Sequence, residues 1–261
     1  MSTITTDTFK EERWQAILGI LAESGRIRVA ALAARLNVSE ATVRRDLEAM
    51  QGLGMLQRTH GGAMLTKPTA FEISFDESQG WAQAEKCAIG RRAAQLVQEG
   101  ETIIIESGST TLELARNLGE IRKLTVLTNS LAICKELSAN EGIEILVLGG
   151  SLRRQSASLV GSWVAETLRN VRVDKAFLGA NGLSASFGIS APNPYTAESR
   201  KAMIAAARTC IALADHNKLG VETLYRVAPL DVLDILVTDT QTVEEQLVAI
   251  REAGVEVLIA G

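Results

Sequence analysis

The apolar residues at the start of the chain recur with the spacing of one helix face. Two groups of four stand at i, i+3, i+4 and i+7, and the first group leads into Ser24-Gly25, a pair typical of a helix end. The groups are Trp14, Ile17, Leu18 and Leu21, and then Val29, Leu32, Ala33 and Leu36. Two amphipathic helices are therefore expected before residue 37.

A third helix is expected directly after Ser39, which is placed as an N-cap, with Glu40 near the positive end of the helix dipole. Val43, Leu47 and Met50 have the spacing of its buried face. The positions left outside are Thr42, Arg44, Arg45, Glu48 and Ala49. A short helix, a turn and a capped helix that exposes hydroxyls and paired arginines near its start are typical of a helix-turn-helix that enters a major groove of DNA.

A glycine-tipped hairpin is expected next, with two short strands between residues 55 and 65 around Gly61-Gly62. Arg58 and His60 flank the turn, where they can reach phosphates or a minor groove, and the glycines allow close backbone approach. A plain three-helix bundle with a solvated arginine pair is the alternative. The order of elements favours a winged helix-turn-helix domain over residues 1–66. Its expected DNA contacts are Ser39, Glu40, Thr42, Arg44, Arg45, Arg58, His60, Gly61 and Gly62.

From Glu85 onward, segments of helix length alternate with short β-rich runs. Strands are expected at 102–105, 124–128, 143–148, 175–178, 210–214, 235–238 and 255–259, and helices at 89–97, 110–118, 131–137, 197–208 and 243–253. This alternation predicts an α/β fold with a parallel sheet covered on both faces, whose ligands lie beyond the C-terminal strand ends. Residues 67–84 are expected to form a polar linker, and 85–261 the larger domain.

Composition and length agree with two globular domains. The chain has 261 residues, 46% of them hydrophobic and 22% charged. No apolar run approaches the roughly 20 residues of a membrane span, and residues 1–10 lack the apolar core of a signal peptide, so a cytoplasmic location without membrane contact is expected. Cys87, Cys134 and Cys210 are too widely spaced for a disulfide framework or a metal site. Neither a cofactor nor a metal is expected.

The charge is unevenly divided. The whole chain carries −4, but residues 1–67 hold nine Lys/Arg and seven Asp/Glu, a net charge of +2 that leaves −6 for the remainder. The sign suits a DNA-binding N-terminal part. Because each copy neutralises few phosphates, useful affinity requires several copies on one duplex, and a homo-oligomer is expected.

The strongest ligand motif is Glu106-Ser-Gly-Ser-Thr-Thr111, between an expected strand and an expected helix. Backbone N–H groups and hydroxyls beside a helix N-terminus suit a phosphate, whereas the alternative is an ordinary turn with Ser/Thr capping. Small or polar turns also follow strands at 128–130, 149–151 and 179–182, so several loops are expected to converge on one pocket.

Other charged residues near strand ends are weaker candidates. Lys218 can neutralise a phosphate or belong to a solvated turn, and Glu198 can accept hydrogen bonds from sugar hydroxyls or serve only as a helix-terminal residue. Arg153 and Arg154 are adjacent, so both cannot point inward on a regular element. Lys175, beside Asp174, is explained equally well by an ion pair.

These motifs resemble the DeoR-type bacterial transcriptional regulators. In the N-terminal part the matching segments are Val38-Ser-Glu-Ala-Thr-Val-Arg-Arg-Asp-Leu47 and Arg58-Thr-His-Gly-Gly-Ala63. In the larger domain they are 106–111, 126–130, 149–153, 173–179, 198–201 and 214–220. The resemblance implies a winged helix-turn-helix joined to a sugar-phosphate-sensing domain with the fold of ribose-5-phosphate isomerase and coenzyme A transferases. Glu106 departs from the pattern, because relatives usually place Asp there.

By this resemblance the Ser/Thr loop and Lys218 would hold a phosphate, while Asn129, Lys175 and Glu198 would line the sugar end. The complete expected ligand site is Glu106, Ser107, Gly108, Ser109, Thr110, Thr111, Asn129, Gly150, Arg153, Lys175, Glu198 and Lys218.

The resulting hypothesis is a DNA-binding regulator, a repressor of a carbohydrate-utilisation operon, which a phosphorylated sugar releases from double-stranded operator DNA. One alternative is a sugar-phosphate isomerase with Glu198 as base and Lys175 or Lys218 stabilising an enediolate. Another is a DNA-binding protein with a vestigial sensor. The N-terminal module argues against an enzyme, since an isomerase has no use for it.

Overall fold

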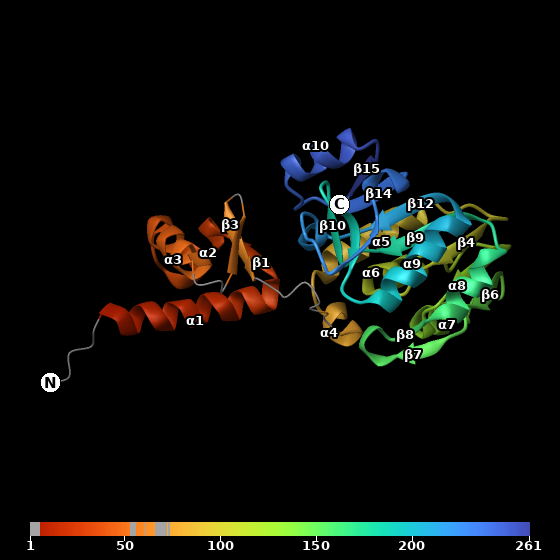
Figure 1. Cartoon of the computed structure of the whole chain (residues 1–261), viewed down its shortest axis with the longest axis horizontal. Helices are drawn as coiled ribbons and strands as arrows, with labels where there is room; N and C mark the ends of the chain where they lie inside the picture. The colour runs from red at the N-terminus through yellow and green to blue at the C-terminus, as the bar shows by residue number, and fades with distance from the viewer. Residues whose placement is uncertain (1–5, 53–55, 60, 66–71, 73) are drawn as a thin grey trace. The chain divides into compact units, whose positions relative to one another are not determined.

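The computed structural model describes residues 6–52, 56–59, 61–65, 72 and 74–261. The chain divides into two compact units, Met1–Pro68 and Thr69–Gly261 (Figure 1). Each unit has its own hydrophobic core. In the described part of the chain, none of the helices combines the length and apolar character needed to cross a membrane.

The smaller unit contains the three expected helices. They are α1 (Thr6–Ser24), α2 (Val29–Leu36) and α3 (Glu40–Gly52). Their predicted inward positions form the core, in which Ile17, Leu21, Leu32, Val43, Leu47 and Met50 are all 0% exposed. The sequence periodicity therefore identified both the helices and the faces that pack together.

The hairpin of this unit is part of a three-stranded sheet. Strands β2 (Leu56–Thr59) and β3 (Gly62–Leu65) pair as expected, but β1 (Arg26–Arg28) adds to the other side of β3, giving the order β1-β3-β2. A Cβ atom at Gly62 would lie 2.3 Å from the carbonyl oxygen of Ile27, so only glycine allows β1 to approach. Three residues are too few to show a strand period, which is why β1 was not predicted.

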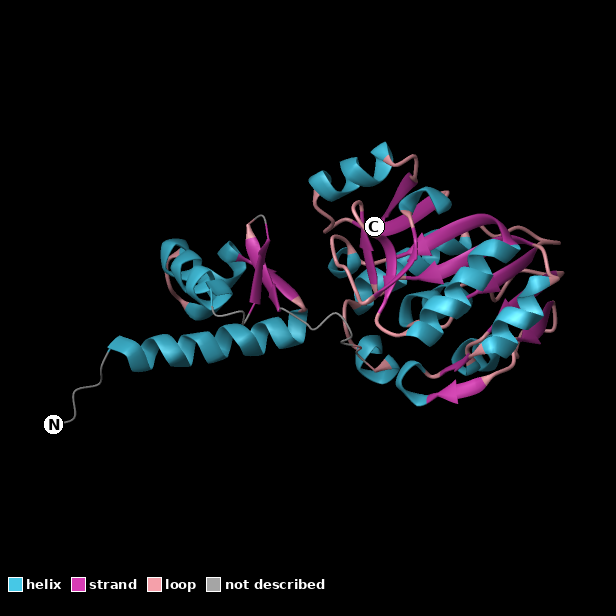
Figure 2. Cartoon of the chain, viewed as in Figure 1, coloured by secondary structure: helices cyan, strands magenta, loops and turns pink. Residues whose placement is uncertain are grey.

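The larger unit is built around a seven-stranded sheet in which every pair is parallel (Figure 2). The strands, in sheet order, are β15 (Glu256–Ala260), β14 (Ile235–Asp239), β12 (Ala207–Leu213), β9 (Val173–Gly179), β4 (Thr102–Ile105), β5 (Leu124–Thr128) and β6 (Ile143–Val147). The predicted parallel α/β architecture is thus confirmed, and all seven strands were expected close to these positions.

Helices cover both faces of this sheet. Alternate residues of β4 enter different cores: Ile103 and Ile105 pack with α5 (Gln83–Ala94), α6 (Ser109–Arg116) and α7 (Leu131–Leu137), while Ile104 faces α8 (Ser162–Arg169) and α9 (Pro194–Ala206). Helix α10 (Glu244–Glu252) packs on this second side of the sheet, near β12 and β14. Burial on both faces explains why the strands are continuous apolar runs rather than alternating ones.

Several short elements were not expected. The strands among them are the hairpin of β7 (Ser151–Arg153) and β8 (Ser158–Val160) and the antiparallel sheet of β10 (Gly182–Ser184), β11 (Gly188–Ala191) and β13 (Tyr225–Ala228). The helices are α4 (Phe75–Gln79) and α8. The 3-10 turns are η1 (Arg154–Ser156), η2 (His216–Lys218) and η3 (Leu230–Val232). Residues 72 and 74–84, expected in a linker, belong to the larger unit and include all of α4. Apart from α8, which has eight residues, these elements have three to five residues and are too short for a periodic signal.

The contact between α5 and α6 depends on Gly90. A Cβ atom there would lie 2.5 Å from the backbone carbonyl carbon of Glu113. We expect Gly90→Ala to lower the free energy of unfolding by about 1 to 3 kcal/mol, because the two helices must move apart. Chemical denaturation of this variant and of Gly119→Ala, whose Cβ meets nothing within 4 Å, provides the comparison. Equal free energies of unfolding for the two variants would show that α5 and α6 move apart without loss of stability.

Candidate functional site

The outer face of α3 presents the polar residues expected at a DNA-reading surface. Ser39 caps the helix, since its hydroxyl accepts a hydrogen bond from the backbone N–H of Thr42 at 3.1 Å, and the two hydroxyls lie 2.9 Å apart. Arg44 and Arg45 are exposed, and Arg44 forms an ion pair with Glu40 at 3.0 Å. The cap therefore fixes the start of the helix next to its exposed arginines.

Asp46, the residue after the arginine pair, is buried and 4% exposed. Arg13 of α1 donates to both of its carboxylate oxygens, and the indole of Trp14 donates to Oδ1 at 3.1 Å. Burial alone would raise the pKa of Asp46, but these hydrogen bonds outweigh it and hold the pKa below its usual value. The buried carboxylate anchors α3 to α1 while the neighbouring arginines face solvent.

The structure describes three of the four hairpin residues that were expected to contact DNA. Arg58 is partly exposed on β2, and Gly61 is exposed with a φ of +89°, a conformation that favours glycine. Gly62, also expected to contact DNA, is buried against β1, and its lack of a side chain allows that strand to approach. His60, also expected there, lies outside the described residues.

In the larger unit a cavity lies at the C-terminal ends of three neighbouring strands. Its empty space is about 670 Å³, part of it open to solvent. The loop after β4 and the first turn of α6 contribute Ser107, Gly108, Ser109 and Thr110. The end of β9 and the loop after it contribute Gly179, Ala180 and Asn181, and the turn after β12 contributes Lys218. Loops from three strand ends therefore converge on one cavity at the centre of the sheet, but the expected turns at 128–130 and 149–151 do not line it.

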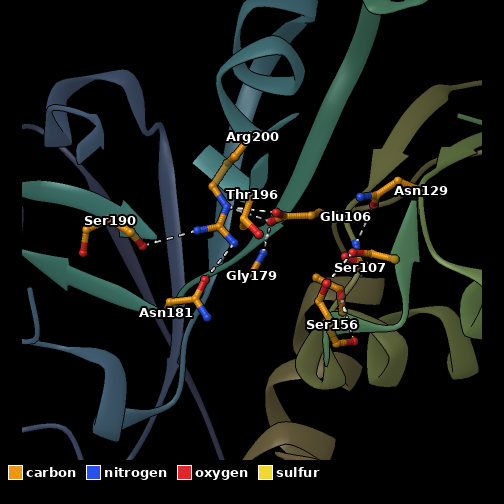
Figure 3. A network of polar contacts seen from close by, with 12 residues as sticks. Glu106, Ser107, Asn129, Ser156, Gly179, Asn181, Ser190, Thr196 and Arg200 are labelled. Carbon is orange, nitrogen blue, oxygen red and sulfur yellow. Dashed lines mark hydrogen bonds and ion pairs between the residues drawn. The ribbon is translucent and has the colours of Figure 1, made fainter. Parts of the chain in front are cut away.

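Two predicted residues hold the Ser/Thr loop in shape rather than line the cavity. Asn129 is buried, accepts a hydrogen bond from the backbone N–H of Ser107 at 2.9 Å, and donates to the carbonyl of Leu159 at 3.1 Å (Figure 3). Thr111 is 0% exposed and donates to the carbonyl of Gly108 at 3.0 Å. Both side chains position the segment from Ser107 to Thr110, which lines the cavity.

Glu106 and Arg200 form a buried ion pair at the wall of the cavity (Figure 3). Arg200 Nε donates to both carboxylate oxygens at 3.0 Å, and the N–H of Gly179 donates to Oε2 at 3.0 Å. Burial raises the pKa of Glu106, although Arg200 and the Gly179 amide favour its charged form. The remaining nitrogens of Arg200 reach the carbonyl of Ser190 and Oδ1 of Asn181, each at 3.4 Å.

Lys86 of α5 is a cavity residue that the sequence did not single out. It is 2% exposed and donates to the carbonyl and the hydroxyl of Ser78. Burial lowers its pKa to about 8, with Asp215 opposing the shift and Lys218 adding to it. The sequence contained a pattern that could have identified Lys86. It shares the buried face of α5 with Ile89, Gly90 and Ala93, and a lysine on such a face is unusual.

Lys175 and Glu198, both expected as ligand residues, do not line the cavity. Lys175 lies at the opposite, N-terminal end of β9, where it donates to the carbonyl of Leu96 at 2.7 Å and pairs with Glu101. Glu198 is exposed. Thr196 and Arg200 of α9 line the cavity, because residues four apart lie on the same face of a helix. Glu198 lies midway between them in the sequence and therefore points away from that face.

Gly150 and Arg153 lie beside the cavity without lining it. A Cβ atom at Gly150 would meet the carbonyl oxygen of Val160 at 2.5 Å, so its glycine permits a close backbone contact. Arg153 donates both terminal nitrogens to the carboxylate of Glu72 at 2.6 Å, and Glu72 is the residue that faces the cavity. Neither residue lines the cavity as a ligand residue would.

Three cations, Lys86, Arg200 and Lys218, line the cavity together with serines and threonines. Within the described ranges, no group of His, Cys, Asp and Glu has the arrangement of a metal site. A cationic cavity rich in N–H and O–H donors suits a phosphorylated, hydroxylated anion. Together with the exposed arginines of α3, it defines the class of protein: a DNA-binding regulator with a ligand-sensing unit.

Comparison with known proteins identifies the family. Residues 13–69 match the DeoR-like helix-turn-helix domain and residues 81–240 the DeoR C terminal sensor domain. The chain is 37% identical over 253 residues to the HTH-type transcriptional repressor GlcR of Bacillus subtilis, covering 96% of each, and 31% identical to a putative aga operon transcriptional repressor of Escherichia coli O157:H7, covering 97% of this chain and 95% of that one. The chain belongs to the DeoR family of transcriptional regulators.

Among solved structures, ribose 5-phosphate isomerase A from Methanocaldococcus jannaschii matches at 20% identity with a TM-score of 0.39, covering 52% of this chain and 54% of that one.

The buried pair makes a prediction about pH and stability. Arg200→Met should lower the free energy of unfolding by about 3 to 5 kcal/mol at neutral pH, since it leaves a buried carboxylate unpaired. With its folded-state pKa raised further, Glu106 would bind a proton more tightly in the folded state than in the unfolded one. The stability of the variant should therefore fall as pH rises above the usual pKa of a glutamate, about 4.3. Urea denaturation across this pH range measures it.

The double variant Glu106→Gln/Arg200→Met is the matched control, because it lacks the carboxyl group. It should recover part of the lost stability and lose the added pH dependence. A single variant as pH-independent as the double one would show that Glu106 does not carry a buried charge.

Proposed function

We propose that the protein represses transcription by binding operator DNA through α3 and the hairpin, and that a phosphorylated sugar in the cavity of the larger unit relieves repression. The observation that carries the proposal is the cavity itself, where the Ser/Thr loop, Lys86 and Lys218 provide donors and positive charge at the C-terminal edge of a parallel sheet. Two relatives named as repressors support the sign of regulation.

At the DNA end, Thr42, Arg44 and Arg45 are the proposed major-groove contacts, with Ser39 and Glu40 at the helix start. Arg45 contacts DNA directly, whereas Arg44 exchanges its ion pair with Glu40 for a base or a phosphate. Arg58, His60 and the Gly61 turn contact the backbone or a minor groove.

At the ligand end, the phosphate lies against the loop from Ser107 to Thr110, between Lys86 and Lys218. The loop opens α6, so its N–H groups add the positive end of a helix dipole to the two ammonium charges. The sugar hydroxyls face Asn181, Thr196 and Arg200. Glu106 acts through Arg200, whose guanidinium it holds in place.

An isomerase function has less support. Its chemistry needs a carboxylate base beside the sugar, and Glu198, the candidate for that role, is exposed and away from the cavity. Glu106 is already paired with Arg200, and Glu72 with Arg153. We therefore propose that the larger unit senses its ligand without converting it. We also propose that the protein acts in the cytoplasm as a homo-oligomer, because one copy brings few cations to a DNA duplex.

Replacing Arg45 by Ala should weaken operator binding by about 1 to 3 kcal/mol if the arginine reads a base, or reduce the salt slope by about one if it contacts a phosphate. Fluorescence anisotropy at several salt concentrations, with a duplex that the full chain selects from a random pool, measures both quantities. Arg169→Ala on α8, an exposed arginine of the sensor unit, should change neither. Unaltered affinity and salt slope in the double variant Arg44→Ala/Arg45→Ala would remove α3 from the interface.

In a thermal-shift panel of sugar phosphates and inorganic phosphate, at least one ester should stabilise the protein without being converted, and should release the selected duplex. Lys86→Met and Lys218→Met should each abolish the shift, whereas Lys175→Met should retain it, since that lysine lies at the far end of its strand.

Because Lys86 has a pKa of about 8 and must be protonated to attract phosphate, the affinity for the ester should decrease as pH rises through that value. Turnover of ribose 5-phosphate would contradict the sensor function.

A further inference from the structure

The segment through which the chain enters the larger unit forms one wall of the cavity. We call Glu72 and residues 74–79 the entry strap; it contributes Glu72, Phe75 and Ser78 to the cavity lining. In chain order the strap lies between β3 of the DNA-binding unit and α5 of the sensor unit. Any change in how it is held is therefore covalently connected to the DNA-binding unit.

The first half of the strap is held by Glu72. Its carboxylate accepts two hydrogen bonds from Arg153 at 2.6 Å and one from Asn193 Nδ2 at 3.0 Å, and its carbonyl accepts one from Gln155 Nε2 at 3.2 Å. Arg153 and Gln155 come from β7 and the turn after it, and Asn193 caps α9. Glu72 thus ties the strap to two elements that also border the cavity.

The second half of the strap is held by the groups proposed to bind the phosphate. The hydroxyl of Ser78 lies 2.9 Å from that of Ser109, at the start of α6. Lys86 donates to the carbonyl of Ser78 and, at 3.4 Å, to its hydroxyl. A phosphate beside Ser109 and Lys86 would require the same donors that Ser78 occupies in the structure.

The strap has little stability of its own. Helix α4 has five residues, fewer than an isolated helix needs, and a capping box between Ser74 and Glu77 closes only its first turn. Phe75 is its buried apolar anchor. The strap's position therefore depends on its contacts with Arg153, Asn193, Ser109 and Lys86.

We propose that the phosphate of the effector displaces Ser78 from Lys86 and Ser109, and that this exchange loosens the entry strap and so carries the ligand signal toward the DNA-binding unit. The inference rests on the proposed effector site and names how that site is regulated. A ligand shifts an equilibrium only by binding two states unequally, and here the favoured state is the one in which the strap no longer occupies the donors.

Reciprocity gives the first test, because a weaker strap must bind the effector more tightly. Glu72→Gln and Ser78→Ala, in the full chain, should each bind ribose 5-phosphate and inorganic phosphate roughly threefold to tenfold more tightly than the wild type. Glu244→Gln, which removes the acid of an exposed ion pair with Arg251 on α10, is the matched control and should leave the affinity unchanged. Isothermal titration calorimetry measures all four proteins.

Hydrogen exchange of the wild type gives the second test and requires no substitution. Within the strap and just after it, the N–H groups of Ser78, Gly80 and Trp81 donate to Ser74, Glu77 and Ser78, respectively. Saturating phosphate ligand should make these amides exchange several-fold faster, while that of Lys86, inside α5, stays protected.

The outcomes separate the two proposals. A wild type that no phosphate ligand stabilises would overturn the effector site and this inference with it. Tight binding with unchanged exchange in residues 74–81 would leave the effector site standing and overturn the strap exchange. Weaker binding by Glu72→Gln and Ser78→Ala would also overturn it, because the strap would then clamp the ligand instead of competing with it.

Discussion

The cavity of the larger unit depends on how a carboxylate is accommodated at the end of a central, fully buried strand. Glu106 follows β4 and has almost no contact with water, so its charge must be balanced locally. Arg200 reaches it from α9 and the Gly179 amide from the end of β9. One interaction thus joins two strands and a helix, and the cavity is the space that remains between their ends.

The regular part of the molecule could be predicted from the sequence. Continuous apolar runs marked the strands of the parallel sheet, and residues such as Ile17, Val43 and Leu47 marked the packed faces of the N-terminal helices. The Ser/Thr loop was also predicted, because its composition at a strand end indicates an anion site. The short strands and α4 were not, since three to five residues carry no period and their positions depend on tertiary contacts.

Candidate ligand residues were harder to predict, for a geometric reason. Lys175 and Lys86 are both lysines on regular elements of the larger unit, yet one lies at the N-terminal end of a strand and the other in the cavity. Glu198 and Arg200 are two residues apart on α9 and face opposite ways. Residue type alone does not show which of these side chains reach the cavity. That depends on which end of the strand a residue occupies and on which face of the helix it lies. Lys86 has the spacing of the buried face of α5, but it was missed because this helix was expected to begin only at residue 89.

The Arg44-Arg45-Asp46 triplet divides two tasks among adjacent residues. Its carboxylate is enclosed by Arg13 and Trp14 and stabilises the packing of α3, while its arginines are exposed to solvent. Substitutions at the exposed positions therefore leave the scaffold intact. After gene duplication, one copy of such a protein can therefore evolve to recognise a new operator sequence in a few steps without first losing its fold. This helps to explain how one architecture can diversify into many separate regulators.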